Sequence, residues 1–410
     1  MSKKTHKHTK RHKHKKTRRH RHNKMLPNRN PRYINEISQS IFLNAPANLP
    51  PLANSVSIIE QKTGPTSYSP SINKELVMLQ SIEREKVHDC NNEKAFDLKE
   101  PLQIGIPGQI YGKTCVPYYN DNAIKFLLKN LSANKHVKPD KIVPPIQSQS
   151  NCWFNTMFIT LFVSDKGRKF FHFFRQLMIE GIQINGKAIP NNLRNGFALL
   201  NYAIDACLTG NKYAYTLDTN AIIRNIYDAI PEKYKDKMPY LTNIDEAGNP
   251  MRYYSSLISY LNNESIQMLF IKDATEKWKD MIIKESEKQK HLPHCIILEI
   301  YDGSNKTAGP SGIVTNKPRS FFVKGVKYAL DSCVIRDISQ QHFCATLTCE
   351  KKEMAYDGMS YHRLVDLSWK KYINSDFSWG FDGSKHSDGA PLQWNFTHGY
   401  QMLLYYRHTF

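Results

Sequence analysis

Cys152 lies where a polar segment meets a strongly apolar one, in QSQSNCWFNT (147–156). The residues before it favour a loop, whereas residues 152–163 are apolar almost all round, as in a buried helix. Cys152 is therefore expected at a helix N-terminus, where unpaired N–H groups and the helix dipole favour an anion such as a thiolate. On this segment alone, a nucleophile and a buried core thiol are equally good interpretations.

A thiol nucleophile needs a general base that titrates near neutral pH, which points to histidine. His342 stands at the head of an alternating apolar segment, and Asp357 ends the short segment that follows it. If residues 343–349 and 353–357 pair as a hairpin, Asp357 lies beside His342 and can orient its imidazole. The usual alternative for a lone histidine is a structural role in the core or at the surface.

The elements expected to position these residues are helices in the earlier part of the chain and strands in the later part. Apolar spacing predicts helices in the following segments: 72–86, 122–134, 152–163, 166–180, 193–208, 219–229 and, with interruptions, 253–289. After Pro293, short β-branched and aromatic runs broken by Gly, Asp and Asn predict strands. This order indicates an α+β domain over 144–410, with a helical half at about 144–290 and a sheet half at about 291–410.

The 410-residue chain has a net charge of +20, concentrated at its N-terminus. Residues 1–24 contain 12 Lys and Arg, 6 His and no acidic residue, so the other 386 residues carry only +8. We interpret residues 1–24 as a disordered basic tail that is a nuclear address, a nucleic-acid-binding arm or a solubilising segment. Residues 25–75, rich in Pro, Ser and Asn, are interpreted as a linker, and residues 76–143 as a helical N-terminal extension.

The eight cysteines include no CxxC pair, so a zinc ribbon is not expected, nor is any other metal or cofactor. There is no secretory signal and no apolar run approaching the ~18 residues of a membrane span. We therefore expect an intracellular protein, in the cytoplasm or nucleus, with reduced thiols and no membrane association. Cys344 and Cys349 should face opposite sides of one strand. Segment 379–399 is interpreted as a loop whose Asp382 and Asp388 do not bind a metal.

Five segments resemble, at a distance, motifs of the ubiquitin-specific proteases, a family of papain-like cysteine peptidases. NCWFN (151–155) resembles the family's cysteine box, Asn-Thr-Cys-Tyr-x-Asn, and HFCA (342–345) its histidine box, His-Tyr-x-Ala. Tyr356-Asp357 matches an aromatic residue followed by Asp or Asn about one hairpin later. LPHCIILEI (292–300) and GYQMLLYY (399–406) resemble two of the family's strands, and all five segments follow the family's order over roughly residues 144–407.

This resemblance implies a papain-like fold, with a helical subdomain followed by an antiparallel sheet subdomain, and a deubiquitinase-like activity. Cys152 would be the nucleophile, His342 the base and then the acid, and Asp357 the residue that orients the imidazole. Gln147 falls where the family places its oxyanion-hole amide, five residues before the cysteine. Asp331 or Asp337 is a less favoured alternative to Asp357.

The chain also departs from the family's pattern. The glycine that usually precedes the cysteine box is absent, and Gln340-Gln341 replaces the glycine common before the histidine. The sequence also lacks the zinc-ribbon cysteine pairs and the long insertion that help the family to grip ubiquitin. The resemblance therefore specifies the chemistry more closely than the substrate.

Two substrate classes stay open, both of them proteins: ubiquitin or ubiquitin-like conjugates, and a structural precursor cut by a viral type of maturation protease. The second would fit a large DNA virus as source and a location in the virion, and the richness in Lys, Asn, Ile and Tyr indicates an AT-rich genome. The alternative from another class is a non-catalytic protein that binds nucleic acid or protein. The presence of Cys152, His342 and Asp357 together argues against that alternative.

Overall fold

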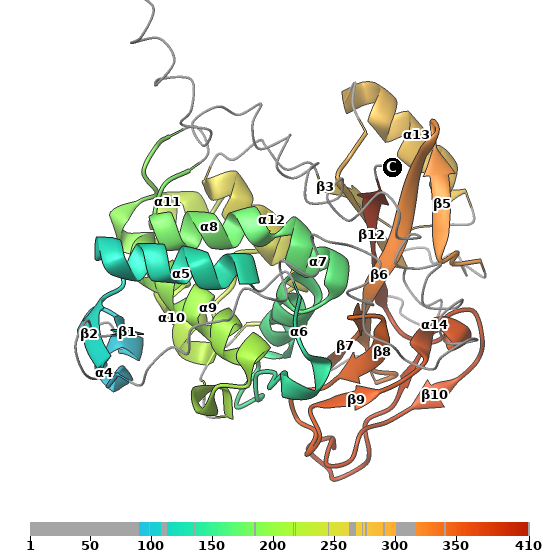
Figure 1. The fold of residues 1–410 in the computed structure, drawn as a ribbon. Helices are drawn as coiled ribbons and strands as arrows, with labels where there is room; N and C mark the ends of the chain where they lie inside the picture. Colours follow the sequence, from blue (N-terminus) through green and yellow to red (C-terminus); the bar gives the residue numbers. More distant parts are fainter. Residues whose placement is uncertain are drawn as a thin grey trace, which may run out of the picture.

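The computed structural model describes residues 90–408 with the exception of 98, 108–112, 134–135, 184–185, 216, 218, 245, 262–267, 273, 275–276, 290–291, 301–315 and 340–341. The predicted basic tail (1–24), the linker (25–75) and the helix predicted at 72–86 lie outside these residues. The described chain forms a mixed α/β structure, in which a group of helices packs beside a mostly antiparallel sheet (Figure 1).

The described part of the N-terminal extension is only partly helical. It contains α4 (Glu93–Phe96), β1 (Gln103–Pro107), β2 (Lys113–Pro117), α5 (Asp121–Ala133) and the 3-10 helix η3 (Pro139–Lys141). α5 confirms the helix predicted at 122–134. The interpretation of residues 76–143 as a helical extension is wrong for β1 and β2, which form an antiparallel hairpin. A disulfide joins Cys90 to Cys115, so the expectation that all eight thiols are reduced is wrong for this pair.

Helices dominate the chain from residue 152 to residue 289, as predicted. They are α6 (Cys152–Phe162), α7 (Asp165–Phe170), α8 (His172–Glu180), α9 (Asn191–Thr209), η4 (Lys212–Tyr215), α10 (Thr219–Ala229), α11 (Glu232–Lys235), α12 (Pro250–Tyr260) and α13 (Trp278–Gln289). The segment predicted as an interrupted helix at 253–289 also contains a strand, β3 (Met268–Ile271). This strand is a four-residue apolar run, too short for periodicity to distinguish it from a helix.

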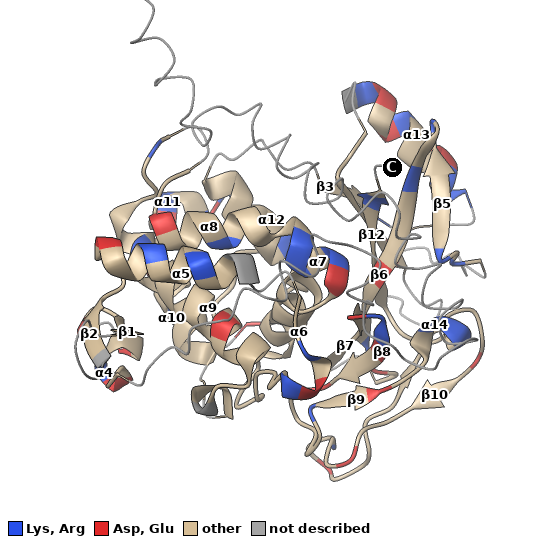
Figure 2. Ribbon diagram, viewed as in Figure 1, with Lys and Arg blue, Asp and Glu red and all other residues tan. Residues whose placement is uncertain are grey.

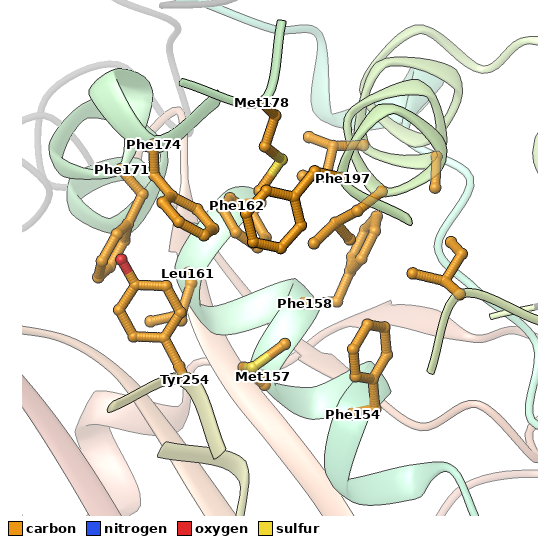
Figure 3. Close-up of a cluster of buried hydrophobic side chains, with 14 of the residues drawn as sticks. Phe154, Met157, Phe158, Leu161, Phe162, Phe171, Phe174, Met178, Phe197 and Tyr254 are labelled. Carbon is orange, nitrogen blue, oxygen red and sulfur yellow. The ribbon is translucent and has the colours of Figure 1, made fainter. Parts of the chain in front are cut away.

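Helix α6 has no polar face because it is enclosed on all sides. Every residue from Trp153 to Phe162 is buried. Figure 3 shows Phe154, Phe158 and Phe162 on this helix, in one cluster with Phe174 and Met178 of α8 and Phe197 of α9. Phe162, for example, stacks on Phe174 of α8 with 6.4 Å between ring centroids. Burial of these aromatic side chains fixes the direction of α6, and so the position of its first residue.

The second half of the described chain forms the sheet. Its elements are β4 (Cys295–Ile300), β5 (Ser320–Val323), β6 (Val326–Arg336), β7 (Phe343–Cys349), β8 (Lys352–Tyr356), β9 (Leu364–Asp366), α14 (Trp369–Tyr372), β10 (Ser378–Trp379), β11 (Trp394–Asn395) and β12 (Gln401–His408). The order is β3-β4-β12-β6-β7-β8-β9, with β5 also paired to β6; β3–β4 is the parallel pair and the other pairs in this sheet are antiparallel. β6 is long for this sheet, since it runs without a break from Val326 to Arg336.

Both faces of the central strands are buried. On β12, Met402, Leu404 and Tyr406 pack against the helices, whereas Leu403 and Tyr405 belong to a second core on the opposite face. The second core is covered by α13, α14 and the C-terminal loops. Cys344 and Cys349 lie in different cores, as the strand alternation predicted.

A buried ion cluster joins the helical half to the sheet half. The carboxylate of Asp165, in α7, accepts the backbone N–H groups of Glu350 (2.7 Å) and Lys351 (3.3 Å) in the β7–β8 turn. Arg168 pairs with both Asp165 (3.1 Å) and Glu350 (2.5 Å). Glu350 and Lys351 have φ angles of 45° and 69°, which side-chain-bearing residues adopt at a cost. Asp165 therefore holds a strained turn in place and links α7 to it.

Charge outside this cluster is mixed. Figure 2 shows Lys and Arg interspersed with Asp and Glu on α5, α7 and α13, in keeping with the modest net charge outside the basic tail. In the described part of the chain, we find no helix with the length and apolar character needed to cross a bilayer.

We predict that Asp165→Asn lowers the free energy of unfolding by about 3 kcal/mol, because it removes one of the two carboxylates paired with the buried Arg168 and the charged acceptor of the turn N–H groups. Urea denaturation measures this change. Asp366→Asn is the matched control, since Asp366 makes a 2.7 Å ion pair with Lys352 but its side chain is 68% exposed. The control should cost less than about 1 kcal/mol. Equal losses for the two variants would contradict a structural role for the cluster.

Candidate active site

Cys152 is the first residue of α6 and is half-buried. The other free cysteines among the described residues are fully buried: Cys207, Cys295, Cys333, Cys344 and Cys349. Burial raises the pKa of each of these five thiols above its usual value. Cys152 is therefore the free thiol that an electrophile can reach, and it stands at the predicted helix N-terminus.

His342 and Asp357 are brought together by the predicted hairpin. β7 and β8 pair in the register Ala345↔Tyr356, so the residue before β7 and the residue after β8 lie at the same end. Nε2 of His342 lies 2.7 Å from Oδ1 of Asp357, and both side chains are buried. The turn is shorter than the predicted strand bounds of 343–349 and 353–357 imply, since Cys349 pairs with Lys352 across Glu350 and Lys351.

Cys152 lies close enough to His342 for its charge to act on the imidazole. Burial lowers the pKa of His342, but the hydrogen bond with Asp357 and the negative charges of Asp357 and Cys152 outweigh burial and raise that pKa to about 10. The imidazole is then protonated at neutral pH and faces the sulfur. An imidazolium beside a thiolate is the arrangement that activates cysteine as a nucleophile.

Asp357 is fully buried and is held by several donors. Its Oδ1 accepts the N–H of Met359 (3.1 Å) as well as His342, and its Oδ2 accepts the hydroxyl of Ser384. Trp394 packs edge-on against the imidazole, with 5.8 Å between ring centroids. The hydrogen bond between His342 and Asp357 is thus shielded from water, which strengthens it.

The alternative orienting residues have other contacts. Asp331 accepts the backbone N–H groups of Lys166 (3.0 Å) and Gly167 (3.2 Å) in α7. Asp337 accepts the backbone N–H of His342 at 2.5 Å, so it fixes the main chain of His342 while Asp357 contacts the ring.

Gln147 lies beside the end of the β7–β8 hairpin. Its backbone N–H donates to the carbonyl of Gly358 (2.9 Å), and its side-chain Oε1 is buried without a hydrogen-bond partner in the described structure. This oxygen is an acceptor, so the group that could serve an oxyanion is Nε2 of the same amide. The role of Gln147 as an oxyanion donor stays a prediction.

A network of buried amides and a hydroxyl fixes the segment that leads to Cys152. Nδ2 of Asn151 donates to Oγ1 of Thr219 (2.9 Å) and to Oδ1 of Asn220 (2.7 Å). Thr219 donates to Oδ1 of Asn155 (2.8 Å), and Nδ2 of Asn155 donates to the carbonyl of Ile146 (3.2 Å). Thr219 and Asn220 begin α10, and sequence analysis did not identify them because they are far from Cys152 along the chain.

The loop at 379–399 lies next to these groups and contributes Ser384 and Trp394, which sequence analysis also did not single out. It contains β11 and the second residue of β10, so it is not wholly irregular. Oδ1 of Asp388 accepts the N–H of Ala390 within the loop. Across the described residues, no three His, Cys, Asp or Glu side chains are grouped so as to hold a metal ion.

We predict that Thr219→Val lowers the free energy of unfolding by about 1–3 kcal/mol, because Asn151 and Asn155 lose a buried partner while the volume is conserved. It should also slow alkylation of Cys152 by iodoacetamide. The control is Thr114→Val at an exposed position of β2, expected to change stability by less than about 0.5 kcal/mol. A Thr219→Val protein as stable as this control would rule out the network as a support for α6.

A second prediction concerns pH. Because the pKa of His342 is raised from about 6.5 in the unfolded chain to about 10, its protonation stabilises the fold fully below pH ~6.5, and this contribution is lost as pH rises toward 10. Asp357→Asn removes the main cause of the rise. The stability difference between wild type and this variant should therefore be largest near pH 6 and shrink toward pH 10, as measured by urea denaturation. A difference that grows with pH would contradict the assignment.

Comparisons with known proteins give structural neighbours alone. No protein-family model matches the chain, and no curated protein matches it. Solved structures that are similar include the SAGA DUB module Ubp8/Sgf11/Sus1/Sgf73 bound to monoubiquitin, with 10% identity, a TM-score of 0.39 and coverage of 87% of this chain and 95% of that chain. The same module bound to ubiquitin aldehyde has 10% identity, a TM-score of 0.38 and coverage of 92% and 98%. A third, the Ubp8-Sgf11-Sgf73-Sus1 SAGA DUB module, has 11% identity, a TM-score of 0.36 and coverage of 66% and 68%.

Proposed function

We propose that this protein is a papain-like cysteine peptidase that hydrolyses peptide or isopeptide bonds through an acyl-enzyme. The observation that carries the proposal is the hydrogen-bonded pair of His342 and Asp357 beside the half-buried thiol of Cys152, at the junction of the two halves. Cys152 comes from the start of a buried helix, and the other two residues come from the ends of one hairpin. This arrangement unites a reachable thiol, a protonated imidazole and a buried carboxylate.

The reaction follows from these positions. The thiolate of Cys152 attacks the carbonyl carbon, and the tetrahedral intermediate collapses as the His342 imidazolium gives its proton to the leaving amine. The thioester that remains is attacked by water, from which the now neutral His342 takes a proton. Collapse of the second intermediate releases the acid and restores the thiolate and imidazolium. Asp357 keeps the imidazole in one orientation and stabilises its charged form throughout.

The developing oxyanion would be held at the start of α6. Backbone N–H groups in the first turn of a helix have no partner within the helix, and the helix dipole favours negative charge there. Gln147 would add its side-chain amide from residues 145–151, the approach segment that leads to Cys152. The main chain of Gln147 is fixed by its hydrogen bond to the carbonyl of Gly358 (2.9 Å), and a donor positioned in advance costs less reorganisation during the reaction.

The substrate is a protein, and we favour ubiquitin or ubiquitin-like conjugates. The support is the resemblance of the cysteine box at 151–155, the histidine box at 342–345 and the strand at 399–406 to those of ubiquitin-specific proteases. A structural precursor is the second substrate class. Nucleic acid binding by residues 1–24, and a cytoplasmic or nuclear location, remain predictions from the sequence.

We predict that Cys152→Ala reduces turnover of a ubiquitin C-terminal fluorogenic amide by at least about 10³-fold, because nucleophile and base act as a unit. Cys333→Ala, which removes a buried thiol of the second core, is the control and should retain activity. Asp357→Ala should cost less than either Cys152→Ala or His342→Ala. Retention of activity by Cys152→Ala would refute the peptidase assignment.

The same variants distinguish the substrate classes. Ubiquitin with a C-terminal electrophile should form an adduct with the wild-type protein and the Cys333→Ala control but not with Cys152→Ala, as seen by intact mass. Iodoacetamide should label Cys152 before the five buried thiols. Labelling of Cys152 by iodoacetamide without reaction with the ubiquitin probe would favour the precursor class over ubiquitin.

A further inference from the structure

Ser384 lies between β10 and β11 and is 1% exposed. Its hydroxyl donates a hydrogen bond to Oδ2 of Asp357. We propose that Ser384 is a positioning residue of the reaction, which holds the Asp357 carboxylate so that Oδ1 stays on the imidazole. This inference rests on the proposed peptidase function and adds a residue from a distant loop to its machinery.

The two oxygens of Asp357 have different tasks. Oδ1 accepts two hydrogen bonds, from Nε2 of His342 (2.7 Å) and from the N–H of Met359 (3.1 Å). Oδ2 has the Ser384 hydroxyl as its partner among the described residues. The terminal torsion of an aspartate is broad, so the carboxylate plane is fixed by its hydrogen bonds rather than by a rotamer well. Without the hydroxyl, a buried carboxylate oxygen lacks a donor and the plane can rotate away from the imidazole.

Ser384 can act in this way because its loop is fastened to the segment that follows Asp357. The carbonyl of Asp382 accepts the N–H of Tyr361 (2.9 Å) and the hydroxyl of Ser360 (3.1 Å). The ring of Tyr361 lies over Gly383, where an added Cβ would meet it at 3.0 Å. Ser384 itself is held from the other strand of the loop, since its carbonyl accepts the N–H of Leu392 (3.1 Å). The hydroxyl is therefore presented from a rigid turn.

The same loop is fastened to the segment that carries His342. The carbonyl of Gln393 accepts the N–H of Ile338 (2.9 Å). The imidazole of His386 lies within 3.4 Å of the Ser339 hydroxyl, which donates to Asp337. Asp337 in turn accepts the backbone N–H of His342.

Residues 381–393, here called the bridging loop, thus contact both segments that present the base and its orienting acid. A loop that contacts only one of them could support that segment without fixing the distance between the two. Contact with both fixes the relative position of His342 and Asp357, and Ser384 is the point at which the loop reaches the reacting groups.

The test uses alkylation of Cys152 by iodoacetamide, which needs no substrate and reports how reactive the thiol is beside His342 and Asp357. In the full chain, Ser384→Ala should lower the alkylation rate at pH 7 by about 3- to 10-fold and should lower the pKa of His342 as followed by NMR. Turnover should fall through kcat, with KM within about 2-fold. Ser387→Ala, an exposed serine of the same loop, is the control and should match wild type.

A double-mutant cycle separates positioning from general stability. In an Asp357→Ala background, Ser384→Ala should cause no further loss in alkylation rate, because the group through which it acts is gone. Ser384→Thr, which keeps the hydroxyl, should recover much of the wild-type rate. An equal loss in both backgrounds, or a wild-type rate for Ser384→Ala, would overturn the inference. Failure of the peptidase proposal would look different: Cys152→Ala would retain turnover, whatever Ser384→Ala does.

Discussion

The hydrogen bond between His342 and Asp357 is the interaction on which the rest of the site depends. It is buried, shielded by Trp394, and only 2.7 Å long. A buried carboxylate and imidazolium attract one another strongly because little water screens them, but each alone would be costly to bury. The pair is therefore stable only if the protein supplies donors for the remaining carboxylate oxygen and a close partner for the imidazole. Ser384 and Cys152 fill these two roles.

The array also needs the two halves of the molecule to be held together. Cys152 belongs to the helical half and the other two residues to the sheet half, so a small displacement at the junction would separate sulfur from imidazole. The ion cluster around Asp165 opposes such a displacement by joining α7 to the β7–β8 turn, at the opposite end of the hairpin from His342. The amide network around Thr219 opposes it from the helical side by fixing the segment before Cys152. The polar groups of the ion cluster and of the amide network are buried and paired, so each of these two contacts has one preferred geometry.

The sequence predicted those parts of the site that arise from local pattern. An apolar run without a polar face placed Cys152 at the start of a buried helix, and alternation along β7 and β8 placed His342 beside Asp357. Local pattern could not predict the contacts of Thr219 or Ser384, because each acts on a residue more than 20 positions away; the segment 379–399 was recognised as a loop, but nothing in it distinguishes Ser384. The disulfide was missed for a similar reason, since the hairpin that presents Cys115 near Cys90 was itself interpreted as helical.

The approach to Cys152 shows how one departure in sequence is accommodated in structure. No glycine precedes the cysteine box, yet the approach segment lies very close to the end of the hairpin. The close approach is made possible by a glycine of the hairpin, Gly358, instead of a glycine before Cys152. A Cβ added to Gly358 would meet both the N and Cβ of Gln147 at 3.0 Å. The segment is held there by the hydroxyl of Tyr356, which donates to the carbonyl of Pro145 at 2.8 Å, and by the Gln147 N–H on Gly358. Gly358 follows Asp357 directly, so the close contact that places the Gln147 amide also ties the approach segment to the acid of the array.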